Sequence, residues 1–174
     1  SFGTEDKQVD TVIEPATVKS IVGYRIESID EQMGPCTGTD TLKRCLTFQV
    51  EYPVVTGGIS DSLHAELNQN ILSDITNFYF LSEEPVDFEG LKSNLQSDFE
   101  GLLKDFPDYE NNWSVEVISD ILHQDSLFIS VATTITSYTG GAHSNYMQSY
   151  RSYDLRTGEA VTLDDLFKSG YEEK

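Results

Sequence analysis

The sequence of 174 residues has little positive charge, few histidines and no long apolar run. Eleven Lys and Arg stand against 30 Asp and Glu, for a formal net charge of -19. Nucleic-acid phosphates and anionic lipid surfaces both attract clustered basic side chains, so this composition argues against either partner. No stretch approaches the roughly 20 apolar residues of a membrane span, and no basic-then-apolar signal peptide is present. We therefore expect contact with a membrane only through an anchor outside this chain.

The sequence also lacks the usual patterns of catalytic and metal sites. His64, His123 and His143 are scattered, whereas zinc enzymes usually pair closely spaced histidines, and no G-x-S-x-G nucleophile motif occurs. Residues 105–111 offer several oxygen ligands but lack the spacing and central glycine of an EF-hand, which favours a solvated connector. We predict no metal, no cofactor and a role other than catalysis.

The two cysteines, Cys36 and Cys45, flank a polar loop between two predicted strands. A bond between them would close a short ring and contribute about 2–3 kcal/mol. Disulfides persist in oxidising compartments, so the bond would place the domain in the periplasm or at the cell surface. The alternative is a pair of reduced thiols in a cytosolic loop. We favour the disulfide, because free thiols in this polar loop would be exposed.

Apolar residues make up 38% of the chain, enough for a core, and their spacing predicts an α+β domain. Polar residues 1–16 have no periodicity and are interpreted as a flexible tether. Residues 17–174 form one domain, with a first half over 17–106 and a second half over 107–174. Period-two alternation is the signature of half-buried strands. It predicts strands over 17–29, 46–52, 113–117, 127–136 and 145–155, and a short one over 160–162.

Two stretches have apolar residues at helical spacing. The first begins after Gly57-Gly58 and runs over 59–78, with Ser60 or Asp61 as its N-cap. The second runs over 88–106, with Asp87 as its cap and Pro107 at its end. A short helix follows Leu163. Hairpin-length links between most strands predict an antiparallel sheet, with the two amphipathic helices packed on one of its faces.

One loop stands out as a candidate binding site. It joins two predicted strands and contains two glycines, which permit positive φ or close approach of a neighbour. The flanking tyrosines offer apolar rings with polar tips, which suit protein or sugar contacts. A purely conformational role for the glycine pair is the alternative. The candidate residues are Tyr138, Gly140, Gly141, Ala142, His143 and Tyr146.

The run Tyr138–His143, followed by 153–159 (YDLRTGE) and 163–167 (LDDLF), resembles a family of bacterial extracytoplasmic domains. This family includes the sensor domain of RsiV-type anti-sigma factors and the non-catalytic region of PdaC-type peptidoglycan deacetylases. The segment 50–53, Gly57-Gly58 and the helix holding Leu67-Asn68 resemble its first half. The resemblance covers roughly 20–174, and the family continues past the last helix, so this chain would be truncated there.

The resemblance implies a binding or sensing domain outside the cytoplasmic membrane, held in the full-length protein by a lipid anchor, which we favour, or by a membrane helix. RsiV-type domains recognise lysozyme, a basic protein, and residues 51–150 of this chain hold 16 acidic residues against two lysines. A peptidoglycan- or carbohydrate-binding accessory module is the alternative. A hydrolase with its site near His143 is a third, and it requires a carboxylate or nucleophile within reach of that ring.

Overall fold

A computed structural model describes residues 22–36, 44–79 and 87–167. The predicted tether over residues 1–16 lies outside the described residues, as does the start of the strand predicted over 17–29. The described elements follow in chain order: β1 (Gly23–Met33), β2 (Leu46–Gly57), α1 (Asp61–Tyr79), α2 (Phe88–Asp105), β3 (Trp113–Gln124), β4 (Phe128–Tyr138), β5 (Asn145–Asp154) and α3 (Leu163–Leu166).

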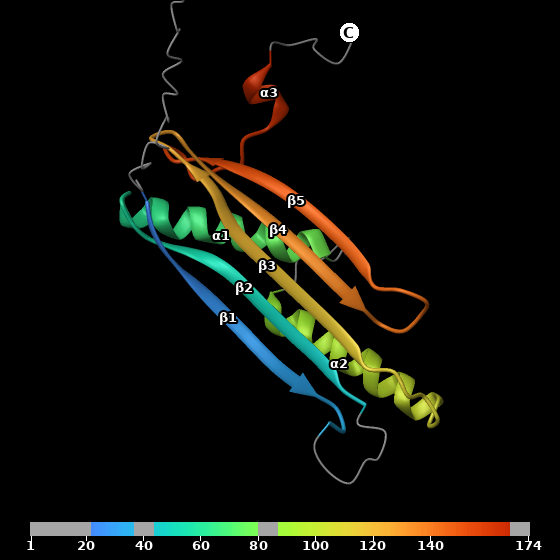
Figure 1. Cartoon of the computed structure of the whole chain (residues 1–174). Coiled ribbons are helices and arrows are strands. Elements are labelled where there is room, and N and C mark those ends of the chain that lie inside the picture. The colour runs from blue at the N-terminus through green and yellow to red at the C-terminus, as the bar shows by residue number, and fades with distance from the viewer. Residues whose placement is uncertain (1–21, 37–43, 80–86, 168–174) are drawn as a thin grey trace, which may run out of the picture.

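The five strands form one sheet in the order β1-β2-β3-β4-β5 (Figure 1). Three of the four pairings are antiparallel, as expected from the short links. The β2–β3 pairing is parallel, which the hairpin argument did not anticipate. The cause is the connection, since α1 and α2 lie between these strands and carry the chain back to the end where β2 began. The α+β class with two main helices on the sheet is confirmed.

Both long helices pack on the same face of the sheet, where the core lies (Figure 1). Along β4, and along β3 as far as Ile121, the odd-numbered residues face the helices and the even-numbered ones face away; a bulge between Ile121 and His123 reverses the pattern at the end of β3. The predicted apolar stripes supply the helix side of this core. The buried core residues of the helices are Leu67, Ile71 and Ile75 in α1 and Phe88, Leu91, Leu95 and Phe99 in α2.

Local hydrogen bonds fix where the helices begin and dock. Asp87 caps α2 as predicted, because its side chain accepts a bond of 2.8 Å from the backbone of Gly90. In α1, the Asn68 amide bonds both the N–H and the carbonyl of Val55, at 2.8 and 2.9 Å. Val55 lies where β2 has left β3, so Asn68 satisfies backbone groups that the sheet does not reach.

Other element predictions need adjustment. β1 extends to Met33, and β3 continues to Gln124, because polar residues on their exposed faces hide the strand pattern. The strand predicted over 160–162 is a single bridge between Tyr153 and Ala160. Cys36 and Cys45 form the predicted disulfide, with their Cα atoms 4.9 Å apart.

Candidate functional site

The loop between β4 and β5 contains the predicted candidate residues. Gly140 and Gly141 have φ of 89° and 127°, so both need the positive φ that the sequence predicted. The Tyr138 hydroxyl donates a bond of 3.0 Å to the Gly141 carbonyl and ties the loop to its own strand. His143 donates from Nδ1 to the carbonyl of Ser144 at 3.1 Å. A bond to backbone gives no support to the hydrolase alternative, which required a carboxylate or nucleophile beside this ring.

Gly140 also admits a close neighbour, the second role that the sequence allowed for the glycine pair, although the sequence did not identify that neighbour. A Cβ at this position would lie inside van der Waals distance of the Tyr109 hydroxyl. That hydroxyl accepts a bond of 3.0 Å from Nε1 of Trp113, whose ring packs on Phe99 with centroids 5.3 Å apart. The bend therefore rests on the connection between α2 and β3, and Gly140 serves the fold directly.

Of the candidate residues, Tyr146 lies on the sheet face opposite the helices. The register aligns its side chains in rows across the strands. One row runs from β1 to β5 through Asp30, Gln49, Glu116, Thr136 and Tyr146, and the next through Ser28, Glu51, Ile118, Thr134 and Gln148. We call this surface the open face; the viewer of Figure 1 looks onto it.

Two tyrosines of β5 stand on the open face. The side chains of Tyr146 and Tyr150 are 64% and 63% exposed, and they flank Gln148 on the same side of the strand. Ala132 lies directly opposite Tyr150 on β4. Of these two tyrosines, only Tyr146 was among the residues predicted from the sequence, although the period of two places Tyr150 on the same face.

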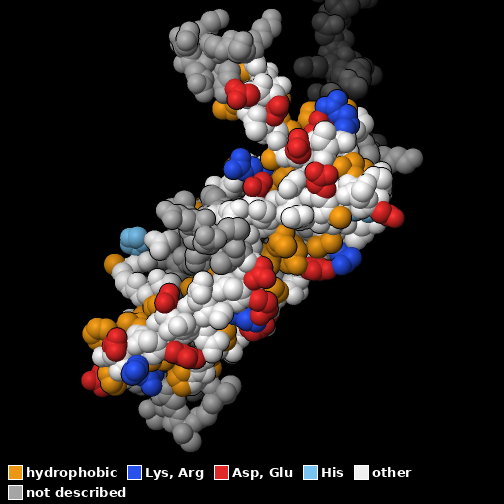
Figure 2. Space-filling model, turned by 180° about the vertical axis from the view of Figure 1, so that it is seen from behind, with side chains coloured by type: hydrophobic (Ala, Val, Ile, Leu, Met, Phe, Trp, Pro, Cys, Tyr) orange, Lys and Arg blue, Asp and Glu red, His pale blue; other side chains and the backbone are white. Residues whose placement is uncertain are grey.

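Carboxylates occupy the other end of the open face. A shallow hollow of about 180 Å³ over β1, β2 and β3 is lined by Asp30, Glu51 and Glu116, and no residue that lines it is basic. Asp120 continues the negative charge along β3. The helix side differs, because Asp and Glu side chains are spread across it and Lys or Arg side chains lie among them (Figure 2). The open face therefore combines exposed aromatic rings with uncompensated negative charge.

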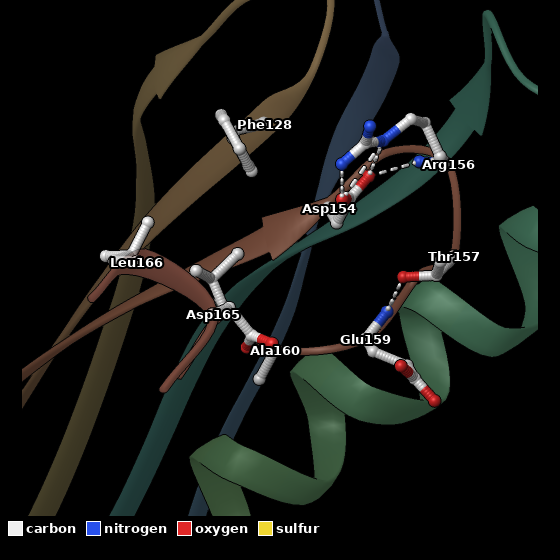
Figure 3. A pocket seen from close by; sticks show the side chains of 9 residues that line it. Phe128, Asp154, Arg156, Thr157, Glu159, Ala160, Asp165 and Leu166 are labelled. Atoms are coloured by element: carbon white, nitrogen blue, oxygen red, sulfur yellow. Dashed lines mark hydrogen bonds and ion pairs between the residues drawn. The ribbon is translucent and has the colours of Figure 1, made fainter. Parts of the chain in front are cut away.

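A second hollow lies between the end of β5 and α3, with a volume of about 310 Å³ (Figure 3). Arg156 binds the Asp154 carboxylate with its guanidinium and its backbone N–H, and these bonds lower the pKa of Asp154 to about 2. Arg156 is neutralised by Asp154, so Glu159 and Asp165, which also line the hollow, leave it with net negative charge. Phe128 and Leu166 line the same hollow.

The turn that follows β5 is anchored to α1. Gly158 has a φ of 77°, and a Cβ there would press on Leu63 and on the backbone of Leu67. Asn70 donates a bond of 2.9 Å to the Gly158 carbonyl. The motif residues of this turn thus have structural tasks.

Across the described ranges, no three His, Cys, Asp or Glu side chains are grouped as metal ligands, and no helix has the length and apolarity to cross a bilayer.

The fold is shared with solved structures of the DUF3298 family. A family member from Pseudomonas aeruginosa PAO1 matches 87% of this chain with a TM-score of 0.61 and 15% identity. Another, from Bacteroides fragilis NCTC 9343, matches 84% with a TM-score of 0.60 and 18% identity. The chain spans 61% and 62% of the length of these two proteins. The comparison with curated proteins found no match.

The sequence itself matches the family model described as "Deacetylase PdaC" over residues 40–146, more than half of the chain. The chain belongs to this family, which confirms the PdaC part of the predicted resemblance. The matched range includes the Gly140-Gly141 bend and ends at the start of β5. The resemblance to RsiV-type sensor domains stays a prediction.

Proposed function

We propose that this PdaC-family domain is a non-catalytic binding domain of the cell envelope that holds a basic protein on its open face. The observation that carries the proposal is the composition of that face. Asp30, Glu51 and Glu116 surround a hollow without a basic residue, while exposed tyrosines provide apolar contact area on β5. Aromatic side chains at the centre of a contact supply affinity, and complementary charge supplies orientation and a high association rate.

The overall charge supports a cationic ligand. A formal net charge of -19 attracts basic proteins from a distance and repels acidic ones. A basic cell-wall hydrolase such as lysozyme is the most concrete partner. The Cys36–Cys45 disulfide is compatible with the oxidising compartment where such an enzyme acts. Since the family's description names a deacetylase, the proposed role is that of an accessory to such an activity or of a sensor without it.

The test is the affinity for lysozyme at low and high ionic strength, measured by surface plasmon resonance. Screening shortens the reach of charge to about 8–10 Å near physiological salt, so affinity should fall steeply as salt is added. Asp30→Asn on the open face should weaken binding about 1.5- to 5-fold, the range of an exposed ion pair. Asp98→Asn removes the same charge from an exposed position on α2 and is the matched control. Equal losses from both variants, or no binding at either ionic strength, would reject the proposal.

The exposed tyrosine pair favours a second candidate, a glycan of the cell wall. Sugar rings stack on aromatic faces, and Gln148 between Tyr146 and Tyr150 can donate to or accept from hydroxyls. In this case Tyr146→Ala should abolish retention on isolated cell walls, Tyr146→Phe should preserve it, and added salt should have little effect. Retention that falls with salt and survives Tyr146→Ala would reject the glycan and favour the basic protein.

A further inference from the structure

β5 is an edge strand whose outer side offers unused backbone hydrogen bonds. The carbonyl of Ser152 points outward, since it accepts a bond of 2.7 Å from Val161, and the N–H of Asp154 points outward to Glu159 at 2.9 Å. The β4–β5 register is regular, and strand residues alternate in direction. The N–H and carbonyl groups of Tyr146, Gln148 and Tyr150 therefore point outward too, and no described residue bonds them on that side.

The two edges of the sheet differ in their protection. β1 carries Arg25, Glu27, Asp30 and Glu31, and charged side chains on an edge strand discourage pairing with another chain. The ten residues of β5 include only two charges, Arg151 and Asp154, and its first six residues are uncharged. The chain itself pairs with this end, because Val161 bonds Ser152 beside the bridge between Tyr153 and Ala160. Among the described residues, none pairs with the outer side of residues 145–151.

We propose that a second copy of this chain pairs antiparallel with β5, about a two-fold axis that passes beside Gln148. In this register Gln148 lies opposite its own copy, and Tyr146 lies opposite Tyr150 of the other chain. Each of these three pairs joins residues whose backbone groups point outward, so the pairing forms about six hydrogen bonds. Both sheets turn their open faces to the same side, which joins two binding faces into one ten-stranded surface.

The register fits the side chains as well as the backbone. On the open face the two Tyr146–Tyr150 pairs are cross-strand aromatic pairs, which stabilise antiparallel strands. On the helix side Asn145 lies opposite Arg151, so no like charges face each other in the paired segment. A shift by two residues toward the end of β5 would place Gln148 opposite Ser152, whose carbonyl Val161 already occupies.

The whole chain carries -19, so two copies repel each other over their full surfaces. Added salt screens this repulsion, and the self-association should therefore strengthen with salt. This is opposite in sign to the salt dependence expected for a basic ligand. The two proposals are independent: a monomer that binds lysozyme would overturn only the pairing, and a dimer that does not bind it would overturn only the proposed function.

The test is sedimentation equilibrium of the whole chain over a wide concentration range, at low and high salt. As the protein concentration increases, the apparent mass should rise from the 19.5 kDa of the monomer toward twice that value. At high salt this rise should occur at a lower protein concentration. Gln148→Pro removes an outward N–H that no described residue accepts, and Gln148→Glu places two carboxylates opposite each other. Both variants should remain monomeric at concentrations where the natural sequence is dimeric.

Gln32→Glu is the matched control, because Gln32 is an exposed glutamine on the same face of the opposite edge strand. It should dimerise as the natural sequence does. The urea midpoint of each variant, followed by Trp113 fluorescence, shows that its fold is retained. A natural sequence that stays monomeric at both salt concentrations would overturn the proposal, as would dimers that persist in the folded Gln148 variants or disappear in Gln32→Glu.

Discussion

Gly140→Ala tests whether the bend between β4 and β5 is built on Tyr109. A non-glycine residue at a φ of 89° has about 1–2 kcal/mol of backbone strain. The new methyl also displaces the Tyr109 hydroxyl and its bond from Trp113, a loss of about 1 kcal/mol. We expect the free energy of unfolding to fall by about 2–3 kcal/mol, measured by urea denaturation. The single tryptophan lies at this contact and reports it directly.

A double-mutant cycle with Tyr109→Phe separates strain from the clash. Without the hydroxyl, the nearest ring atom lies 3.5 Å from the new Cβ, an ordinary contact. The cost of Gly140→Ala should therefore drop by about 1 kcal/mol in the Tyr109→Phe background. Gly141→Ala is the control, since its Cβ would meet nothing within 4 Å and its cost should not change. Equal costs of Gly140→Ala in both backgrounds would refute the proposed contact.

Two further predictions concern buried polar contacts. Burial, and then the neighbouring Asp74, raise the pKa of Tyr153, whose hydroxyl donates to that carboxylate at 2.8 Å. The buried Tyr153 hydroxyl contributes its full share to the free energy of unfolding below pH 10, the ordinary pKa of tyrosine in the unfolded chain. Above pH 10 only the unfolded chain releases this proton, so the free energy of unfolding falls by about 1.4 kcal/mol per pH unit. The urea-midpoint difference between the natural sequence and Tyr153→Phe should thus shrink from pH 10 to 11; a constant difference would contradict the assignment. Asn68→Ala leaves both backbone groups of Val55 without their partner and should reduce the free energy of unfolding by about 2–3 kcal/mol, measured by urea denaturation. A loss below about 0.5 kcal/mol would show that water replaces the amide.

The elements with strong periodicity could be predicted from the sequence. The core stripe of α2 and the alternation of β4 depend only on the spacing of apolar residues close together in the sequence. The apolar stripe predicts Phe106 as a core residue, but Phe106 is 61% exposed, because α2 ends at Asp105 and Pro107 follows. The ends of β1 and β3 were harder, since exposed strand segments carry polar residues on both faces and resemble loops.

The composition of the open face could not be predicted, because it depends on which strands are neighbours. Asp30 and Glu116 lie far apart in the sequence and meet only through β2, which pairs antiparallel with β1 and parallel with β3. The parallel pairing follows from the two-helix connection and has no local signal. The contact between Tyr109 and Gly140 was missed for the same reason, since it joins two loops from different parts of the chain.

The residues that carry the family resemblance have tasks within the fold. Gly140 admits Tyr109, Tyr138 closes the bend, and Gly158 lets the turn after β5 rest on α1. None of these tasks requires a ligand, so the motif identifies the scaffold and leaves the ligand open. Side chains that no internal contact demands, such as the exposed ring of Tyr146 and the carboxylate of Glu116, are free to differ between domains of the same fold. Specificity should therefore be sought on the open face, and substitutions in the motif should alter stability before they alter binding.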